Sequence, residues 1–121
     1  MAKDRKTARR RVRYRVRKRI IGTPDRPRVA VSRSLRQLRM QAIDDSNEST
    51  LAFVSSLDPD VRKKLKGNGG NVKAAEEIGA KMAKILKDKG YKEIVYDRGG
   101  FIYHGRVKAA AEAMRKGGLS F

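Results

Sequence analysis

The chain has 121 residues, of which 31 are Lys or Arg and 13 are Asp or Glu, so its formal net charge at pH 7 is +18. This length suits one compact domain plus a tail. Cysteine is absent, which excludes a disulfide framework and a thiolate metal site. No apolar run approaches the roughly 18 residues of a membrane span, and the N-terminus lacks the apolar stretch of a secretory signal, so we expect no membrane association.

The positive charge is concentrated in the first 28 residues, which hold 13 basic side chains and two acidic ones, Asp4 and Asp25. Cations at this density cannot be packed into a core. Most of them are arginine, whose planar fork of donors matches phosphate oxygens and whose plane stacks on bases. A helix lying on a membrane needs a broad apolar face, which residues 5–19 do not offer. Nucleic acid is therefore the favoured partner.

Residues 1–21 form a basic tail that we expect to be disordered when free and ordered on its partner. The alternative is a merely solvated tail that keeps the chain in solution. The tail cations expected to bind RNA are Arg9, Arg10, Arg11, Arg13, Arg15, Arg17, Lys18 and Arg19. Residues 22–27 follow as a joint, because one glycine and two prolines interrupt regular structure. We thus expect an RNA-binding tail and linker at 1–27 and a globular RNA-binding domain at 28–121.

Three strands are predicted directly after the joint. Residues 28–33 are rich in valine, residues 38–44 alternate apolar and polar side chains, and residues 50–55 form a third apolar run. Residues 45–49 have the composition of a turn. The short connections indicate an antiparallel meander.

Helical signals dominate the second half of the chain. Asp58 and Pro59 have the pattern of an N-cap and a first helical residue, which predicts a short helix to Leu65. After a glycine-rich loop, Asn71 is expected to cap a helix that runs to about Lys89 and ends at Gly90. The apolar stripe of this helix is Val72, Ala75, Ile78, Met82 and Ile85.

A fourth strand is predicted at residues 93–97, and a last helix from about Arg106 to the glycines at 117 and 118. Leu119 and Phe121 are expected to fold back as apolar anchors. The fold class is therefore α/β (α+β): a mixed, mainly antiparallel four-stranded sheet with packed helices and a basic N-terminal tail. Because a long helix precedes the fourth strand, that strand is expected to lie parallel to a neighbour.

Residues 97–108, DRGGFIYHGRVK, form the most specific local sequence. Two adjacent glycines allow a sharp turn or a close approach to a ligand. Gly105, Arg106 and Lys108 lie at a helix start, which suits a phosphate. Tyr103 and His104 have the chemistry to stack on an unpaired base or to donate to a phosphate. The alternative is a plain strand-to-helix turn with one aromatic ring packed inward, since glycine loops are weak motifs.

Arg33, Arg36 and Arg39 cluster around the first hairpin. If the helices cover one face of the sheet, the end of this hairpin remains available to RNA phosphates. A solvated rim of charge is the alternative.

Support for catalysis is slight. His104 is the single histidine of the chain, so common nucleophile–base pairs are nearly excluded. A two-metal nuclease needs several converging carboxylates. Asp44 and Asp97 end separate strands, whereas Asp45 resembles a turn residue and Asp58 a helix cap. We expect Asp97 to order its own loop, through Arg98 or Arg106, and we expect no enzyme activity, catalytic residue, metal site, cofactor or small-molecule substrate.

The segment DRGGFIYHGRVKAAAEAMRKGGLSF, residues 97–121, closely resembles the bacterial large-subunit (50S) ribosomal protein eighteen family, which binds 5S ribosomal RNA. The segments RPRVAVSRS, QAIDD, TLAFVSS and GNVKAAEEIGAKMA occur upstream in the order and spacing of that family. The resemblance implies a ribonuclease-H-like sheet of the translational-machinery type without nuclease activity. It also implies a place in the central protuberance of the cytoplasmic ribosome, where the protein attaches 5S to 23S ribosomal RNA beside neighbouring large-subunit proteins.

Carried over position by position, the resemblance implies that the tail, Arg33, Ser34, Arg36 and residues 103–106 face RNA. Ser32 stands where the family usually has an aromatic residue, and Arg39 where it often has tyrosine, so stacking by those rings is in question and Arg39 is a candidate substitute. With the tail cations, the residues expected to bind RNA are Arg28, Arg33, Ser34, Arg36, Arg39, Arg98, Tyr103, His104, Gly105, Arg106 and Lys108.

The resulting hypothesis is a non-enzymatic RNA-binding assembly protein. One rival is a general coating protein for DNA or RNA, which would not distinguish duplex DNA from 5S RNA. The other is a metal-dependent nuclease built around Asp97.

Overall fold

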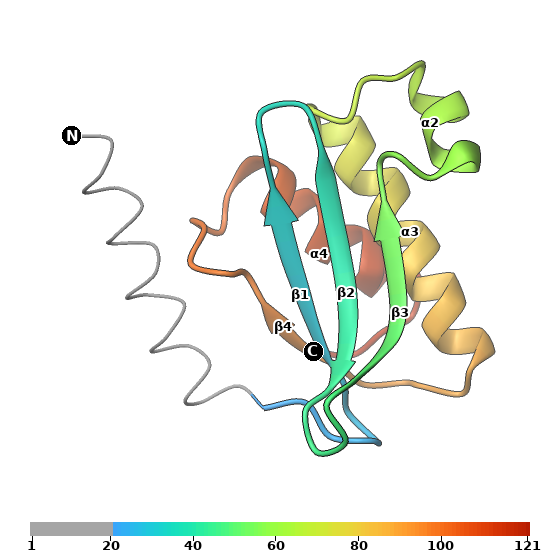
Figure 1. Ribbon diagram of the computed structural model, residues 1–121, viewed down its shortest axis with the longest axis vertical. Helices are drawn as coiled ribbons and strands as arrows, with labels where there is room; N and C mark the ends of the chain where they lie inside the picture. The colour runs from blue at the N-terminus through green and yellow to red at the C-terminus, as the bar shows by residue number, and fades with distance from the viewer. Residues whose placement is uncertain (1–20) are drawn as a thin grey trace.

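A computed structural model describes residues 21–121 of the chain, and in these residues a four-stranded sheet is combined with three α-helices (Figure 1). The tail cations from Arg9 to Arg19, and the expected change of the tail from disorder to order, lie outside the described residues. The elements follow the order β1, β2, β3, α2, α3, β4 and α4. The expected mixed α/β fold is thereby confirmed.

The sheet has the strand order β3-β2-β1-β4. β1 (Arg28–Arg33), β2 (Leu38–Asp44) and β3 (Ser49–Ser55) form an antiparallel meander, and β4 (Val95–Asp97) lies parallel to β1. Alternation explains the strands, since Val29 and Val31 of β1 and Leu38 and Met40 of β2 are buried while intervening residues are exposed or half-buried. Both the meander and the parallel fourth strand agree with the sequence-based prediction.

Two helices cover the same face of the sheet. α3 (Val72–Asp88) and α4 (Gly105–Lys116) lie behind it in the view of Figure 1 and enclose the core. The helices approach closely because Gly79 has no side chain; a Cβ built there would lie 2.5 Å from the carbonyl oxygen of Ala110. None of the helices within residues 21–121 combines the length and the apolar character needed to cross a membrane. The opposite face of the sheet carries no helix from this part of the chain.

The helix boundaries follow local signals with one exception. The side chain of Asn71 accepts a hydrogen bond from the backbone N–H of Ala74, 2.9 Å away, as expected of an N-cap. At the other end of α3, Gly90 has the positive φ (+92°) that favours glycine. α2 (Pro59–Leu65) starts with the expected proline, but Asp58 does not cap it with its side chain. That carboxylate instead accepts from the N–H of Ser55 and from Lys81.

Other boundaries differ slightly from the sequence-based prediction. Val72 is 46% exposed, and Leu86 takes a buried place in α3 that the predicted stripe did not include. β4 begins at residue 95 rather than 93, because Glu93 forms an isolated parallel bridge with Ser120. The C-terminus thus folds back as expected: Leu119 is buried, and the ring of Phe121 packs against Tyr96.

The expected linker at residues 22–27 is fastened to the sheet. The carbonyl of Gly22 accepts from the N–H of Asp45, and the carbonyl of Pro27 accepts from the N–H of Val95. Pro27 is fully buried. A boundary between tail and domain at residue 28 stays a prediction, but these contacts fix the point at which the basic tail leaves the sheet.

Candidate nucleic-acid interface

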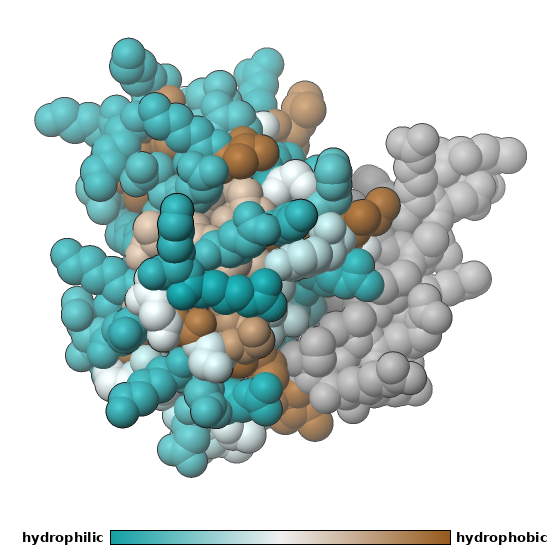
Figure 2. Space-filling view, turned by 180° about the vertical axis from the view of Figure 1, so that it is seen from behind, coloured by the Kyte–Doolittle hydropathy of each residue, from teal (hydrophilic) through white to brown (hydrophobic). Residues whose placement is uncertain are grey.

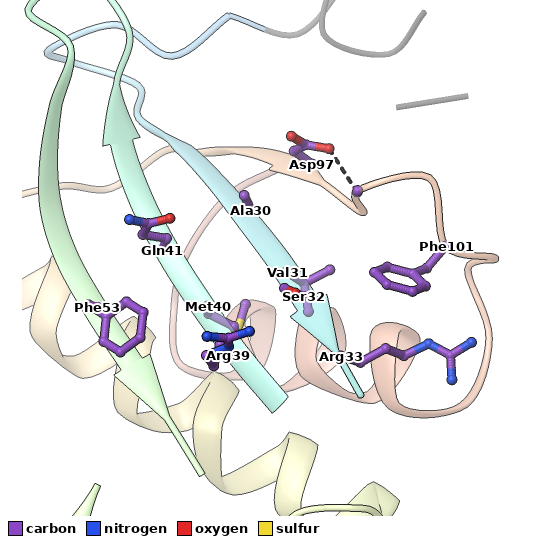
Figure 3. Close-up of a pocket in the computed structure, with 11 residues that line it drawn as sticks. Ala30, Val31, Ser32, Arg33, Arg39, Met40, Gln41, Phe53, Asp97 and Phe101 are labelled. Atoms are coloured by element: carbon purple, nitrogen blue, oxygen red, sulfur yellow. Dashed lines mark hydrogen bonds between the residues drawn. The ribbon is translucent and has the colours of Figure 1, made fainter. Parts of the chain in front are cut away.

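A shallow hollow of about 360 Å³ lies on the sheet face opposite the helices (Figure 3). Its floor and rim come from β1, β2, β3 and the segment after β4. Ser32 of β1 lies directly opposite Arg39 of β2, and Gln41 of β2 lies opposite Phe53 of β3. Ser32 and Arg39, the two positions at which the resemblance put ring stacking in question, are therefore cross-strand neighbours on one surface.

Arg39 and Phe53 give this surface its chemistry. Both are exposed; half of Phe53 is accessible, which is unusual for a phenylalanine in the middle of a strand. Within residues 21–121, Arg39 has no hydrogen bond or ion pair from its side chain. A guanidinium and an aromatic ring on one face of the sheet, both open to solvent, can each stack on a base, and the guanidinium can also bind a phosphate.

The β1–β2 loop places further cations at the end of this face. The guanidinium of Arg33 lies over the ring of Phe101, 4.9 Å from its centroid (Figure 3). Ser34 shapes the loop, because its hydroxyl accepts from the N–H of Gln37 at 3.2 Å. Arg36 is exposed, and its side chain has no hydrogen bond or ion pair among residues 21–121. Arg33 and Arg36 thus lie where the sequence placed them, at the tip of the first hairpin.

Arg106 joins three segments that are far apart in the sequence. Its guanidinium donates to the carbonyls of Ser34, Gln37 and Gly69, at 2.7, 3.3 and 3.4 Å. Partial burial, together with the charge of Arg33 nearby, lowers the pKa of Arg106. Most of its donors are occupied by the protein. Arg106 therefore holds the β1–β2 loop and the 66–71 loop against the start of α4.

The segment between β4 and α4 is ordered by its own side chains. One carboxylate oxygen of Asp97 accepts from the N–H of Gly99 at 2.8 Å, and Arg98 donates to the carbonyl of Phe101 at 3.1 Å. Gly99 and Gly100 both have positive φ, so the expected sharp turn is confirmed.

The remaining residues predicted in this segment lie at its surface. His104 is exposed, and the hydroxyl of Tyr103 is held by a 3.1 Å hydrogen bond from Arg115. Gly105 has a φ of +56° and open space where a Cβ would lie. Lys108 is exposed beside Glu112 at 3.9 Å. Tyr103 and His104 are thus presented outward at the start of α4, as the sequence predicted.

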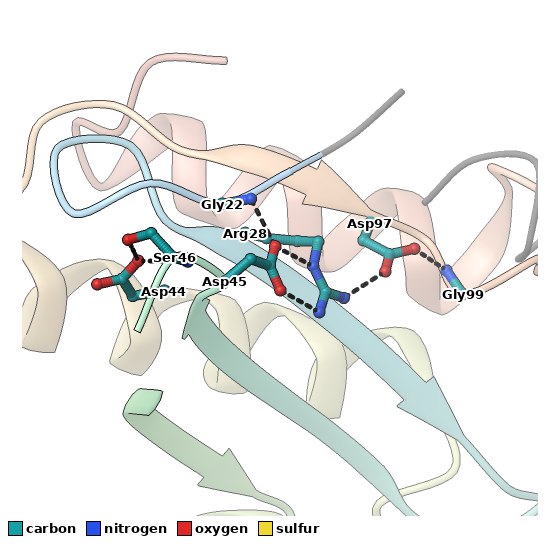
Figure 4. A network of polar contacts seen from close by, with 7 residues as sticks. All are labelled: Gly22, Arg28, Asp44, Asp45, Ser46, Asp97 and Gly99. Carbon is teal, nitrogen blue, oxygen red and sulfur yellow. Dashed lines mark hydrogen bonds and ion pairs between the residues drawn. The ribbon is translucent and has the colours of Figure 1, made fainter. Parts of the chain in front are cut away.

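Arg28 differs from the other predicted RNA contacts because it is buried. Only 7% of it is exposed, and its guanidinium bridges two carboxylates (Figure 4). It binds Asp45 through two hydrogen bonds of 3.0 Å and Asp97 through one of 2.8 Å. The paired hydrogen bond to Asp45 is the main reason why the pKa of Arg28 is raised. In place of an RNA contact, the structure gives Arg28 a structural role.

Two adjacent aspartates lie where the sequence predicted, at the end of β2 and in the turn after it, but their side-chain contacts are not those that these places suggest. Asp44, expected at a strand end, makes the turn: it accepts from the N–H and hydroxyl of Ser46 and from the amide of Asn47. Asp45, expected in the turn, pairs with Arg28 and also accepts from the N–H of Gly22 at 2.6 Å. The composition of residues 44–47 fits either aspartate, and only the position of Arg28 decides between them.

The sequence-based prediction missed Phe53, which lies on the open face of the sheet, and Arg115 of α4, which contacts Tyr103. The alternation in TLAFVS contains the signal for Phe53, since Ala52 and Val54 point to the core and so direct the residue between them to the other face. Arg115 has no such signal. Its contacts with Tyr103 and with the ring of Phe121, 4.3 Å away, depend on the return of the C-terminus.

The buried pair gives the first testable expectation. Asp97→Asn keeps the shape of the side chain but removes the charge that faces Arg28, and should lower the free energy of unfolding by about 2–3 kcal/mol. Urea denaturation measures this decrease, and amide exchange at Gly99 reports on the loop that Asp97 orders. Asp25→Asn, at an exposed position, is the matched control and should leave both unchanged. Equal stabilities for Asp97→Asn and wild type would contradict the structural role.

A second expectation concerns pH. Hydrogen bonds, above all from the Ser46 hydroxyl, lower the pKa of Asp44 in the folded protein. A carboxylate with a lowered folded pKa contributes stability above its unfolded pKa of about 4, and this contribution disappears as pH falls through the folded value. The stability difference between wild type and Asp44→Asn should therefore shrink below about pH 4. Ser46→Ala should show the same trend, and a difference that stays constant into acid would refute the assignment.

The sequence matches the model of a family described as "Ribosomal L18 of archaea, bacteria, mitoch. and chloroplast" over residues 3–121. It is 49% identical over 118 residues to the large ribosomal subunit protein uL18 of Desulforamulus reducens, covering 98% of this chain and 96% of the relative. The uL18 proteins of Symbiobacterium thermophilum and Moorella thermoacetica are 49% and 50% identical, again over 98% of this chain and over 96% and 97% of the relatives.

Proposed function

The chain belongs to the ribosomal L18 family, and from this we propose that it binds 5S ribosomal RNA and helps to attach it to 23S ribosomal RNA in the central protuberance. The chain is a structural component of the large ribosomal subunit and not an enzyme. Its location is accordingly the ribosome. The partners of the protein therefore include ribosomal RNA and neighbouring proteins of the large subunit.

The observation that carries the proposal is the unneutralised charge around one end of the sheet. Arg36 and Arg39 are exposed and without a carboxylate partner in residues 21–121, and Arg33 lies beside them on Phe101. Cations left without acidic partners on a surface are available for phosphates. Of the aspartates around the sheet, Asp45 and Asp97 are engaged by Arg28 and Asp58 by Lys81, so these carboxylates do not stand unpaired against an RNA backbone.

RNA geometry agrees with this arrangement. An A-form helix hides its base edges in a deep, narrow groove, so proteins recognise it by its backbone and recognise bases in loops and bulges. The hairpin arginines suit the backbone. The hollow with Arg39 and Phe53 suits one unpaired base, and Tyr103 with His104 offers a second stacking surface near the start of α4.

Arg106 contributes to this function mainly by positioning. Because its donors bind the carbonyls of Ser34, Gln37 and Gly69, it fixes the loop that carries Arg36. The tail precedes Gly22, whose N–H donates to Asp45. Its cations are a second set that can bind phosphates of 5S or 23S ribosomal RNA.

The nuclease rival is removed by family membership, since this is a structural family. The coating protein is the remaining alternative. It would bind duplex DNA and 5S RNA about equally at physiological salt, whereas a surface fitted to one folded RNA should prefer that RNA. Competition between the two nucleic acids separates the alternatives.

Phe53→Ala tests the hollow on the sheet. If a base stacks on this ring, the variant should bind 5S RNA more weakly by about 1–3 kcal/mol, and should retain its salt dependence because no charge is removed. The ring is half exposed, so its removal should change the urea midpoint little. Val72→Ala, which shortens another exposed apolar side chain, is the control. Unchanged affinity for Phe53→Ala would remove the ring from the interface.

Deletion of residues 1–20 tests the tail. For every phosphate that the shortened chain no longer neutralises, the slope of log affinity against log salt should flatten by about 0.7–0.9. The truncated chain retains residues 21–121, so its fold can be compared directly with that of the full chain by circular dichroism. An unchanged slope with an intact fold would refute the role of the tail in neutralising phosphates.

A further inference from the structure

A second cluster of cations lies on α2 and the turn that follows it. Arg62, Lys63 and Lys66 are exposed and line a hollow of about 520 Å³ together with Leu57, Pro59 and Gly67. None of the three cations has a hydrogen bond or ion pair from its side chain within the described part of the chain. None of them was among the residues expected to bind RNA. We name this set, Arg62, Lys63 and Lys66, the α2 patch.

The acidic residues of α2 do not neutralise this patch. Asp60 and the preceding Asp58 are both bound by Lys81 of α3, at 2.8 and 3.2 Å. Lys64, the remaining cation of the helix, faces Glu77 at 3.8 Å. The carboxylates near α2 are thus occupied on the side that faces α3, and the outer side is left with positive charge.

Lys66 adds an independent sign of function. It has a left-handed backbone, with φ of +51°, at the position after a helix where glycine is preferred. A lysine in this conformation costs about 1–2 kcal/mol. The conformation is fixed by hydrogen bonds from the N–H groups of Lys66 and Gly67 to the carbonyls of Lys63 and Arg62. The turn therefore keeps a strained lysine beside the hollow, although glycine would be more stable there.

The α2 patch lies away from the part of the interface that residues 98–106 form, although the 66–71 loop after α2 is joined to the β1–β2 loop through Arg106. α2 follows β3, at one edge of the sheet, whereas residues 98–106 follow β4, at the other edge (Figure 1). The edge strands are separated by three strand spacings, or on the order of 14 Å, before the loops outside them are added. Figure 2 views the molecule from the helix side and shows mostly hydrophilic residues around α2.

From these observations we propose that the α2 patch is a second RNA-binding surface, which holds the phosphate backbone of an RNA segment other than the one at residues 98–106. This rests on the proposed function, since it gives the chain two RNA surfaces on opposite edges of one sheet. Lys and Arg bind the phosphates, and exposed Leu57 supports a ribose or base between them.

The experiment compares four forms of the full-length chain: wild type, Lys66→Gly, Arg62→Ala/Lys63→Ala, and Lys116→Ala as a control that removes an exposed cation from α4. Each form is first saturated with 5S RNA. Binding of a second, fluorescent RNA duplex is then titrated over a range of salt concentrations. Affinity for 5S RNA alone is measured separately.

The double variant should bind the second RNA roughly tenfold more weakly, and its salt slope should fall by about 0.7–0.9 for each cation removed. Its affinity for 5S RNA should stay within about twofold of wild type. Lys66→Gly should unfold at a higher urea concentration and yet bind the second RNA more weakly, a combination that a purely structural role cannot produce. Lys116→Ala should behave as wild type.

Three results would overturn the proposal. The first is unchanged binding of the second RNA by the double variant. The second is an equal decrease in the affinity of that variant for 5S RNA, which would mean that the two surfaces are one. The third is full competition by polyglutamate at equal charge, which would favour an acidic protein segment as the partner. Failure of the wild type to bind 5S RNA would contradict the proposed function instead. In that case the duplex titrated alone still tests the α2 patch.

Discussion

The structure depends on a buried cation, Arg28, held between two carboxylates from different segments. Asp45 follows β2 and Asp97 ends β4, so one guanidinium joins the two strands that flank β1. The same carboxylates also accept backbone hydrogen bonds: Asp45 accepts from the N–H of Gly22, and Asp97 accepts from the N–H of Gly99 (Figure 4). A buried charge is tolerated only when it is fully paired, so these positions constrain one another. The exit of the basic tail and the loop before α4 are thereby fixed to the same point.

Among the cations of residues 21–121, two groups have different physical roles. Arg28 and Arg106 are satisfied by protein oxygens, carboxylates in one case and backbone carbonyls in the other, and they position loops. Arg36 and Arg39 are exposed without side-chain partners in the described residues and suit a polyanion. Arg28 and Arg106 thus position the segments that present Arg36 and Arg39 to an RNA backbone.

The acidic residues complete this division. Asp45 and Asp97 pair inside, Asp58 and Asp60 bind Lys81, and Asp44 makes a turn, so few carboxylates oppose an approaching phosphate at either edge of the sheet. A ribosomal component with two positive edges and a basic tail is suited to lie between RNA segments. These paired carboxylates stabilise the fold, while other acidic residues, among them Asp25 and Glu76, remain exposed.

The sequence by itself determined the features that depend on neighbours along the chain: the alternating strands, the Asn71 cap, the stop at Gly90 and the glycine turn after Asp97. It also determined the class of partner, because charge is a property of composition. The tertiary structure alone decided that Asp45 rather than Asp44 meets Arg28, and that Arg106 reaches loops 37–72 residues away. Such pairs form because the strand order brings distant segments together, and no local pattern in the sequence encodes that order.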